Sequence, residues 1–354
     1  MVVGGGVVGL AVAAQLSEGS DSVVVLERHL RAGEETSSRN SGVVHAGLHG
    51  PPDSLKRRLC VAGRPLLYEF CARHGVPVAK TGKWILAQTI EEETALEALL
   101  HRGREGGVPG LRLVDGAVFQ RDEPMLCAKT ALRSDESGVV DAAALVDAMR
   151  KVAVERGAIA RFGCALVGAE PLRSGWRLRV EGTGLIESIE TTSVINCAGL
   201  SADRVAAHFG APADGLGRRV HPWKGCYFQV SPRVAASVRC ALVYPMPVQG
   251  GLGVHLTRGI GGETLLGPDA APAAGLDDLD VEAALAEPFA ENARRYFPSL
   301  QAADLSPAYA GLRPKLHPDG AFADFVVHHG PAGVLHLFGL ESPGLTRSPA
   351  IAAH

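Results

Sequence analysis

The sequence predicts a mixed α/β (α+β) fold made of two interleaved domains. The start of the chain reads as strand, helix and strand, the middle as mixed β-structure, and the end returns to strand and helix. A length of 354 residues is enough for about two domains. Glycine accounts for 43 residues, which gather in short clusters between apolar runs, as is typical of tight turns and of backbone that lies close to a bound molecule.

Apolar residues with helical or alternating spacing, bounded by glycine and proline, predict each element in turn. Strands are expected at Met1–Val3, Ser22–Leu26, Trp176–Val180, Ser193–Cys197, Cys226–Val230, Gly253–Thr257 and Thr264–Leu266. Helices are expected at Gly9–Ser17, Ser54–His74, Glu91–Arg104, Val140–Arg156 and Val281–Phe297. A hairpin of Ala321–Val327 and Val334–Phe338 is expected to lead into a last helix near Gly344.

Composition and charge exclude several classes of function. The formal net charge is -3 and no basic tract is present, which argues against nucleic acid as a partner and against strong attachment to anionic lipid. The seven cysteines are scattered and form no C-x-x-C, so we expect neither a disulfide framework nor a metal site. This favours a reducing, cytoplasmic location. No apolar run is long enough for a spanning helix, and the glycine-broken start of the chain does not fit a signal peptide.

A glycine pattern joins the first strand to the first helix. Gly4, Gly6 and Gly9 form G-x-G-x-x-G, and Glu27 ends the next strand. The first glycine permits a tight turn, the second admits a pyrophosphate close to the backbone, and the third lets helix pack on strand. The helix N-terminus faces the phosphates, and the acid accepts hydrogen bonds from ribose hydroxyls. Together these features predict a Rossmann-like dinucleotide site, for which NAD and FAD both remain open.

Further segments narrow the choice of dinucleotide. They are Arg39-Asn40-Ser41-Gly42-Val43-Val44-His45-Ala46-Gly47, Asn196-Cys197-Ala198-Gly199, Gly311-Leu312-Arg313-Pro314-Lys315-Leu316 and Gly339-Leu340-Glu341-Ser342-Pro343-Gly344-Leu345-Thr346. This set resembles the L-2-hydroxyglutarate dehydrogenase/oxidase family, within the FAD-dependent oxidoreductases related to D-amino-acid oxidase. Relative to that family, the chain begins within the first strand and stops early in the last helix, and Lys224, Cys226 and Asp269 replace the usual residues.

The resemblance implies non-covalent FAD and oxidation of an L-2-hydroxy acid, foremost L-2-hydroxyglutarate to 2-oxoglutarate. It implies an FAD-binding domain of residues 1–80, 139–215 and 305–354, and a substrate-binding domain of residues 81–138 and 216–304. The expected cofactor residues are Gly4, Gly6, Gly9, Glu27, Arg28, Arg39, Asn40, Ser41, Gly42, Val167, Ala198, Gly199, Gly339, Ser342, Gly344, Leu345 and Thr346. The electron acceptor is expected to be a quinone or oxygen, and a quinone would imply loose peripheral contact with a membrane.

A 2-hydroxy dicarboxylate needs cations that match its carboxylates. Arg313 offers a planar guanidinium for a bidentate contact. Lys315 shares the face of Arg313 if the strand is regular. Lys224 is a further candidate cation, and Tyr244 completes the expected substrate-binding set.

Oxidation moves the C2 hydrogen as hydride to flavin N5 while a base takes the hydroxyl proton, and histidine is the natural base near neutral pH. His45 lies in the segment expected beside the flavin, and His255 lies in a predicted strand of the substrate domain. In that strand Val254 and Leu256 would point into packing and His255 toward the substrate. We favour His255 as the base, with His45 as the alternative.

Other readings remain open from the sequence. The runner-up enzymes are an amine or amino-acid oxidase and a glycerol-3-phosphate dehydrogenase of the same superfamily. A non-catalytic FAD-binding protein is a different class. A nicotinamide dehydrogenase is less favoured, because such a fold does not require the segments 40–47 and 342–346.

Overall fold

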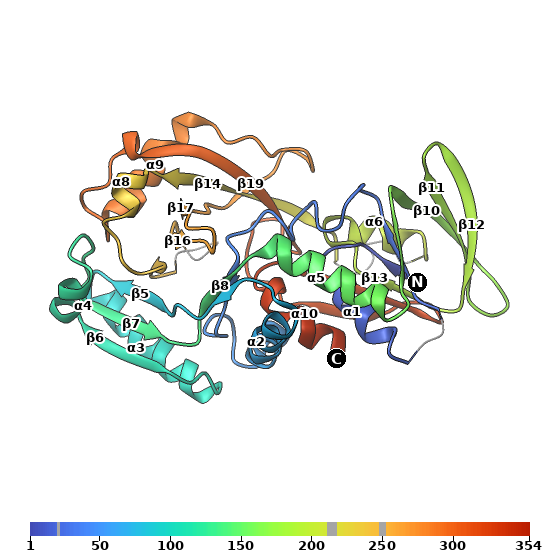
Figure 1. Ribbon diagram of the computed structural model, residues 1–354, viewed down its shortest axis with the longest axis horizontal. Coiled ribbons are helices and arrows are strands. Elements are labelled where there is room, and N and C mark those ends of the chain that lie inside the picture. The colour runs from blue at the N-terminus through green and yellow to red at the C-terminus, as the bar shows by residue number, and fades with distance from the viewer. Residues whose placement is uncertain (20–21, 211–217, 248–252) are drawn as a thin grey trace. The chain divides into compact units, whose positions relative to one another are not determined.

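The computed structural model describes residues 1–19, 22–210, 218–247 and 253–354. The chain forms two compact units, each built from separate stretches of sequence. Unit 1 consists of Met1–Asn40, Ala142–Trp223 and Leu312–His354, and unit 2 consists of Ser41–Asp141 and Lys224–Gly311. The predicted mixed α/β fold is confirmed, with the elements labelled in Figure 1. The predicted domain boundary between residues 215 and 216 lies outside the described residues, and the assignment of domains to cofactor and substrate stays a prediction.

Unit 1 is organised around a six-stranded sheet in the order β20-β21-β13-β1-β2-β9. The first strand pairs in parallel with β2 and β13, and only the edge strand β20 pairs antiparallel, with β21. Short valine-rich strands suit such a sheet, because parallel strands are buried on both faces. The strands are β1 (Val2–Val3), β2 (Val24–Glu27), β9 (Ile159–Phe162), β13 (Val194–Asn196), β20 (Val326–His329) and β21 (Val334–Phe338).

Helix α1 packs against two other helices of unit 1, α5 and α10. Its sequence is apolar on all sides, and eight of its ten residues are buried, as expected of a helix enclosed by other elements. The helices are α1 (Val7–Leu16), α5 (Ala142–Glu155), α6 (Ala202–Ala207) and α10 (Gly344–Ala353). A three-stranded antiparallel meander completes unit 1, with strands β10 (Cys164–Pro171), β11 (Trp176–Gly182) and β12 (Leu185–Thr191).

Unit 2 contains most of a nine-stranded mixed sheet in the order β18-β14-β17-β16-β15-β5-β7-β6, with β19 paired to β14. Its strands are β5 (Lys83–Ala87), β6 (Leu111–Asp115), β7 (Thr130–Ser134), β14 (His221–Val230), β15 (Leu242–Pro245), β16 (Leu256–Arg258), β17 (Thr264–Leu266), β18 (Ala271–Pro272) and β19 (Leu305–Lys315). The division between the units falls within β14 and β19. A small sheet holds β3 (Val43–Val44), β4 (Val78–Ala79) and β8 (Gly138–Val140).

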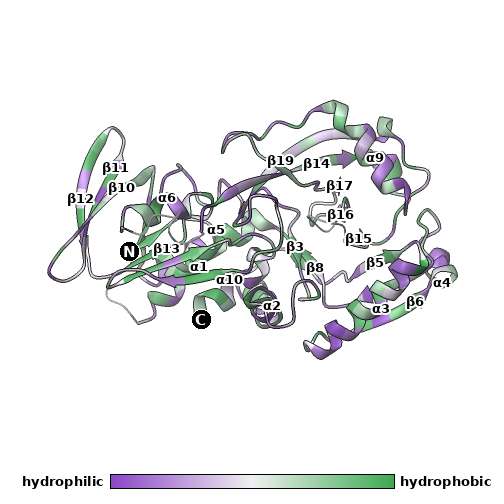
Figure 2. Cartoon of the chain, turned by 180° about the vertical axis from the view of Figure 1, so that it is seen from behind, coloured by the Kyte–Doolittle hydropathy of each residue, from purple (hydrophilic) through white to green (hydrophobic). Residues whose placement is uncertain are grey.

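The helices of unit 2 are α2 (Leu55–His74), α3 (Ile90–Glu105), α4 (Gly116–Asp122), α8 (Pro232–Ala235) and α9 (Ala286–Arg294). Three of them, α2, α3 and α4, begin at a residue whose side chain caps them. The Ser54 side chain accepts the Arg57 N–H at the start of α2, and Gly75 ends that helix with φ 67°. Helix α3 packs on β5, β6 and β7, and Figure 2 shows the alternating purple and green of an amphipathic helix.

Three predicted elements differ from the structure. The predicted strand Ala321–Val327 is wrong for most of its length, because β20 begins only at Val326. The helix expected over Val281–Phe297 is limited to a 3-10 turn and α9, since Pro288 is tolerated only in the first turn of the helix. The strand expected at Gly253–Thr257 begins at Leu256, after Gly253 adopts φ 74°.

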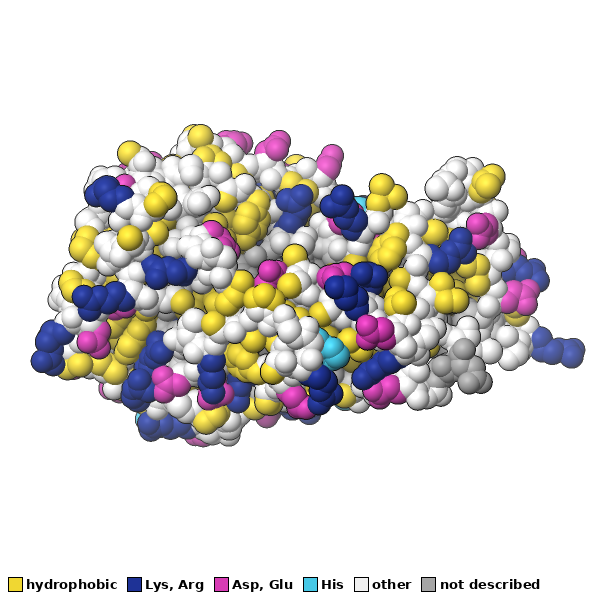
Figure 3. All heavy atoms as spheres, viewed as in Figure 1, with side chains coloured by type: hydrophobic (Ala, Val, Ile, Leu, Met, Phe, Trp, Pro, Cys, Tyr) yellow, Lys and Arg dark blue, Asp and Glu magenta, His cyan; other side chains and the backbone are white. Residues whose placement is uncertain are grey.

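The surface carries charges of both signs. On the face shown in Figure 3, Lys and Arg side chains alternate with Asp and Glu. Within the described ranges, no helix has the length and hydropathy needed to cross a membrane.

Candidate functional site

The structure gives a different reason for glycine at each of the three positions of the first turn. Gly4 has φ 109°, and an added Cβ would lie 2.4 Å from the Cys197 carbonyl oxygen. An added Cβ at Gly9 would lie 2.0 Å from the Gly4 carbonyl oxygen, so this glycine permits the contact of α1 with the turn. Gly6, in contrast, has φ -76°, and among the residues that the structure describes only the Ser37 hydroxyl, at 3.0 Å, lies within 4 Å of an added Cβ. The protein's own packing therefore requires glycine at 4 and 9, while position 6 borders open space at the start of α1.

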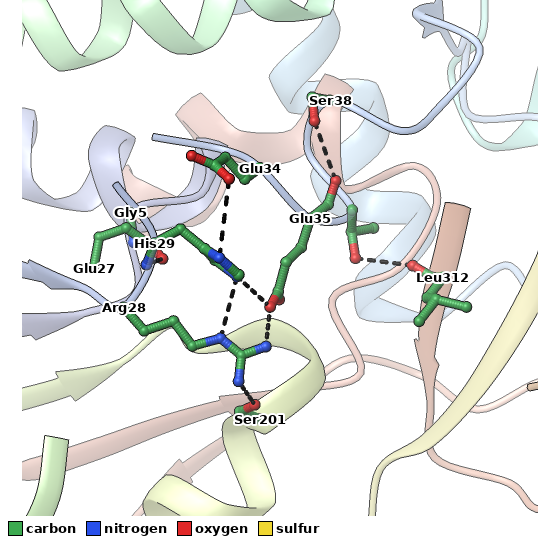
Figure 4. A network of polar contacts seen from close by, with 10 residues as sticks. Gly5, Glu27, Arg28, His29, Glu34, Glu35, Ser38, Ser201 and Leu312 are labelled. Carbon is green, nitrogen blue, oxygen red and sulfur yellow. Dashed lines mark hydrogen bonds and ion pairs between the residues drawn. The ribbon is translucent and has the colours of Figure 1, made fainter. Parts of the chain in front are cut away.

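Glu27 is held in a fixed orientation at the end of β2. Its carboxylate accepts the Gly5 N–H at 2.7 Å through Oε2 and the His29 N–H at 2.8 Å through Oε1. Figure 4 shows these contacts and the neighbouring network, in which Arg28 contacts Glu35 and donates to the Ser201 hydroxyl at 3.2 Å. Glu27 is only 8% exposed. A buried carboxylate so placed beside the glycine turn keeps lone pairs for hydroxyl donors.

The loop after β2 is tied to the glycine turn and to β19. The Ser37 hydroxyl accepts the Val7 N–H at 3.0 Å. The Thr36 hydroxyl donates to the Leu312 carbonyl at 2.8 Å, a contact drawn in Figure 4. The Asn40 amide donates to the carbonyls of Thr36 and Ser37. These bonds fix the backbone on which the predicted cofactor residues Arg39 and Asn40 lie, both of them half-buried.

The predicted residues Ser41 and Gly42 belong to unit 2. Gly42 has φ 62°, and its carbonyl accepts the Val140 N–H at 2.8 Å beside the pairing of β3 with β8. An added Cβ at Gly42 would lie 2.5 Å from the Val140 carbonyl oxygen. The glycine is thus required by the contact between these two strands.

The segment after β13 is organised by Asn196. Its amide donates to the Ala202 carbonyl at 2.7 Å and contacts His336 Nδ1 at 3.1 Å, while its oxygen accepts the Ala198 N–H at 3.1 Å. Burial lowers the pKa of His336 to about 4, so this imidazole is neutral near pH 7. Gly199 follows with φ 51° and begins a 3-10 turn. Ala198 and Gly199 are thereby held at the carboxyl end of β13, next to β1.

Val167 lies at an irregularity of the meander. The pairing of β10 with β11 shifts between Leu166 and Gly168, so Val167 has no partner in the register. A bulge of this kind removes backbone groups from the ladder and re-aims the side chain. The remaining predicted cofactor residues surround the start of α10. Gly339 has φ 69°, the peptide between Ser342 and Pro343 is cis, and Gly344, Leu345 and Thr346 form the first turn of the helix.

The predicted substrate cations lie in different surroundings. Arg313, in the last part of β19, is half-buried in unit 1. The buried Lys315 donates to the Gly320 carbonyl at 2.7 Å and lies 3.8 Å from the Glu341 carboxylate. Lys224 forms a 2.5 Å ion pair with Asp278, which raises the pKa of the lysine. These contacts within the protein satisfy the charges of Lys315 and Lys224. A role of either lysine in substrate binding stays a prediction.

The structure brings Tyr244 and His255 together in unit 2. Their rings stack with centroids 3.8 Å apart and an angle of 15° between their planes. His255 is 4% exposed, and its Nδ1 lies 2.9 Å from the Gly253 carbonyl oxygen. Val254, His255 and Leu256 are all buried, and the predicted direction of the His255 side chain toward the substrate stays a prediction. His45 lies just after β3, and its carbonyl accepts the Cys60 thiol at 3.4 Å.

Sequence reasoning missed two side chains beside this stack. The Lys83 ammonium lies 4.4 Å from the centroid of the Tyr244 ring and 3.4 Å from His49 Nε2. Burial lowers the pKa of Lys83 to about 8. Burial and the nearby charges of Lys83, His255 and Arg102 hold the pKa of His49 well below its usual range. The sequence Gly82-Lys83 fits the family resemblance, but it gave no reason to assign Lys83 a role, and His49 lies in a loop without any such pattern.

The cysteines and acids suggest no further chemistry. None of the seven cysteines forms a disulfide. Among the residues that the structure describes, no three His, Cys, Asp or Glu side chains gather in a way that would hold a metal ion.

Comparison with known proteins assigns the chain to a family. The family model described as FAD dependent oxidoreductase matches residues 1–354. L-2-hydroxyglutarate dehydrogenase from Arabidopsis thaliana is 37% identical, over 100% of this chain and 82% of the relative. Glycerol 3-phosphate dehydrogenase from Caloramator mitchellensis is 28% identical, over 100% of this chain and 72% of the relative. The FAD-bound structure of L-alpha-glycerophosphate oxidase from Mycoplasma pneumoniae has the same fold, with a TM-score of 0.89, 23% identity and coverage of 99% and 92% of the two chains. The chain belongs to the FAD-dependent oxidoreductase family.

Proposed function

We propose that the protein oxidises an L-2-hydroxy acid, foremost L-2-hydroxyglutarate, to the 2-oxo acid. The observation that carries this proposal is the 37% identity with an L-2-hydroxyglutarate dehydrogenase along the whole chain. The bound FAD would accept the C2 hydride at flavin N5. The remaining steps fall to residues of this chain, which must hold the two ligands and take the hydroxyl proton.

The glycine turn fits the pyrophosphate of FAD. The described residues that pack around Gly6 leave its missing side chain without an explanation, and a pyrophosphate lying against the start of α1 would supply one. Glu27, fixed by two backbone N–H groups, would accept the ribose hydroxyls. The bulge at Val167 would present backbone groups to the edge of the adenine ring.

Other segments would hold the rest of the cofactor. Arg28, Arg39, Asn40, Ser41 and Gly42 supply small and polar groups for the pyrophosphate and the ribityl chain, together with Ala198 and Gly199. The first turn of α10 would place backbone N–H groups and the positive end of the helix dipole near the flavin ring. There they would favour the added negative charge. Gly339, Ser342, Gly344, Leu345 and Thr346 belong to this segment.

Arg313 would bind a substrate carboxylate and His255 would take the hydroxyl proton. The Gly253 carbonyl can only accept a hydrogen bond, so the proton of the neutral His255 ring resides on Nδ1. This leaves the lone pair on Nε2, which is the form a general base needs. As the substrate is oxidised, its C2–H bond breaks with both electrons, its O–H proton passes to Nε2, and a C=O bond forms.

A second candidate substrate is glycerol 3-phosphate, which the similarity to the Caloramator enzyme favours. The test records the absorption of the purified, oxidised protein under anaerobic conditions, before and after each substrate. L-2-Hydroxyglutarate is expected to bleach the flavin band, while its D enantiomer, glycerol 3-phosphate and L-amino acids are not. Bleaching by glycerol 3-phosphate or an amino acid alone would reject the proposal in favour of that substrate. A bound flavin that none of them reduces would indicate a non-catalytic protein.

The electron acceptor is part of the same proposal, with a quinone and oxygen as the two candidates. After anaerobic reduction, the flavin band should return on mixing with one of them at a rate that matches turnover. A quinone would bring the protein into loose contact with a membrane surface.

A further inference from the structure

A buried lysine without a carboxylate partner lies in the core of unit 2. Lys83 is 1% exposed, and its ammonium contacts His49 Nε2 at 3.4 Å and the face of Tyr244 at 4.4 Å. Among the described residues, none forms an ion pair with Lys83, and no carboxylate contributes to the shift of its pKa. A buried cation is costly unless something compensates it, so the position calls for an explanation beyond packing.

The ring of Tyr244 links Lys83 to His255. The His255 centroid lies 3.8 Å from the Tyr244 centroid, and the ammonium lies 4.4 Å from that same centroid. The ammonium and the His255 ring centre are therefore at most about 8 Å apart. At that separation in a protein interior two positive charges repel each other measurably.

The groups around this stack come from several elements. Tyr244 lies on β15, and Tyr296, whose hydroxyl donates to the Val254 carbonyl at 3.0 Å, follows α9. Burial raises the pKa of both phenols, which stay neutral. Cys60, on α2, acts on Lys83 by raising its pKa against the effect of burial. The pKa of His49 is held well below its usual range. Among these described neighbours, the positive charge near neutral pH is carried by Lys83 and, from α3, by Arg102.

We propose that Lys83 is a positioning residue whose buried ammonium keeps the imidazole of His255 neutral and ready to take the hydroxyl proton of the substrate. The role of His255 as base rests on the proposed function. The ammonium would also keep the His49 ring neutral. It is a hydrogen-bond donor that faces His49 Nε2, so that nitrogen has to carry a lone pair and no proton. Lys83 stays charged across the range in which a histidine titrates, since its pKa is lowered only to about 8.

The direct test is an NMR titration of the His255 ring, assigned by its loss in His255→Gln. In Lys83→Met, which keeps the length and removes the charge, the pKa of His255 should rise by about 1–1.5 units. In Lys83→Arg, which keeps the charge, it should stay within about 0.3 unit of the wild-type value. An unchanged pKa in Lys83→Met overturns the proposal. If that variant does not fold, the wild type decides alone, because a His255 pKa at or above the ordinary value of about 6.5 overturns it as well.

Kinetics separate this inference from the proposed function. In Lys83→Met, the rate of flavin reduction at saturating substrate should begin to fall on the acid side at a higher pH than in the wild type. This shift in pH should equal the shift of the His255 pKa measured by NMR. The affinity for FAD should not change. A shifted His255 titration with an unshifted rate profile would leave the charge effect standing and reject His255 as the base.

Discussion

Replacing Gly6 by valine separates cofactor binding from folding. The backbone at Gly6, with φ -76° and ψ 175°, suits any residue, and the nearest neighbour of an added Cβ is a rotatable hydroxyl at 3.0 Å. The free energy of unfolding of the apoprotein should therefore fall by no more than about 1 kcal/mol. The added branch would occupy the place of the pyrophosphate. Loss of two charge-assisted hydrogen bonds from the start of α1, at about 1.5–3 kcal/mol each, would weaken FAD binding by roughly 10²–10⁴-fold.

Gly9→Ala is the matched control. Its Cβ would lie 2.0 Å from the Gly4 carbonyl oxygen, which is backbone and has to move. This variant should lower the thermal unfolding midpoint of the apoprotein, with an overpacking cost of about 1–3 kcal/mol or more. The assay titrates FAD into apoprotein by flavin fluorescence and records thermal unfolding without cofactor. Wild-type FAD affinity in Gly6→Val would refute the placement of the pyrophosphate at this turn.

Substitutions at four other residues test the substrate site and the core. Arg313→Ala should weaken substrate binding by about 2–5 kcal/mol, and Arg313→Lys should restore only part of this binding energy. If the substrate constant of Arg313→Ala is unchanged while flavin stays bound, this arginine has a structural role. Of His255→Gln and His45→Gln, the first should slow flavin reduction at saturating substrate by about 10²–10⁴-fold in stopped-flow measurements and the second should mainly raise the substrate constant. If both reduce the flavin at the wild-type rate, neither is the base. His336 has a pKa lowered from 6.5 to about 4, so the unfolded chain binds its proton more readily and stability should fall by roughly 3 kcal/mol as the pH drops from about 6.5 to 4. In His336→Phe, denaturant unfolding should show less of this loss, and an equal pH dependence would contradict the assignment.

The sequence was most informative where the backbone itself is constrained. Local spacing in the sequence predicts three features that the structure has at the same positions. They are the need for glycine at Gly4 and Gly9, the carboxylate of Glu27 at the end of β2, and the capped helix α2. The stack of His255 on Tyr244 and the ammonium of Lys83 were out of reach. They depend on the pairing of β5, β15 and β16, which brings together residues far apart in sequence. Lysine is usually exposed, so a buried Lys83 has no signature in a single sequence.

The pairing of β1 has a consequence for the order of events during synthesis. This first strand is flanked by β2 and β13, and β13 in turn needs β21, which ends at Phe338. Unit 2, in contrast, has all its residues once Gly311 has been made. At about 5–20 residues per second, the ribosome needs on the order of a minute or less to pass from β1 to β21, and the apolar α1 must wait without its partner α10. We expect the sheet of unit 1, and with it the glycine turn proposed to hold the pyrophosphate, to form only after β21 and α10 have been made.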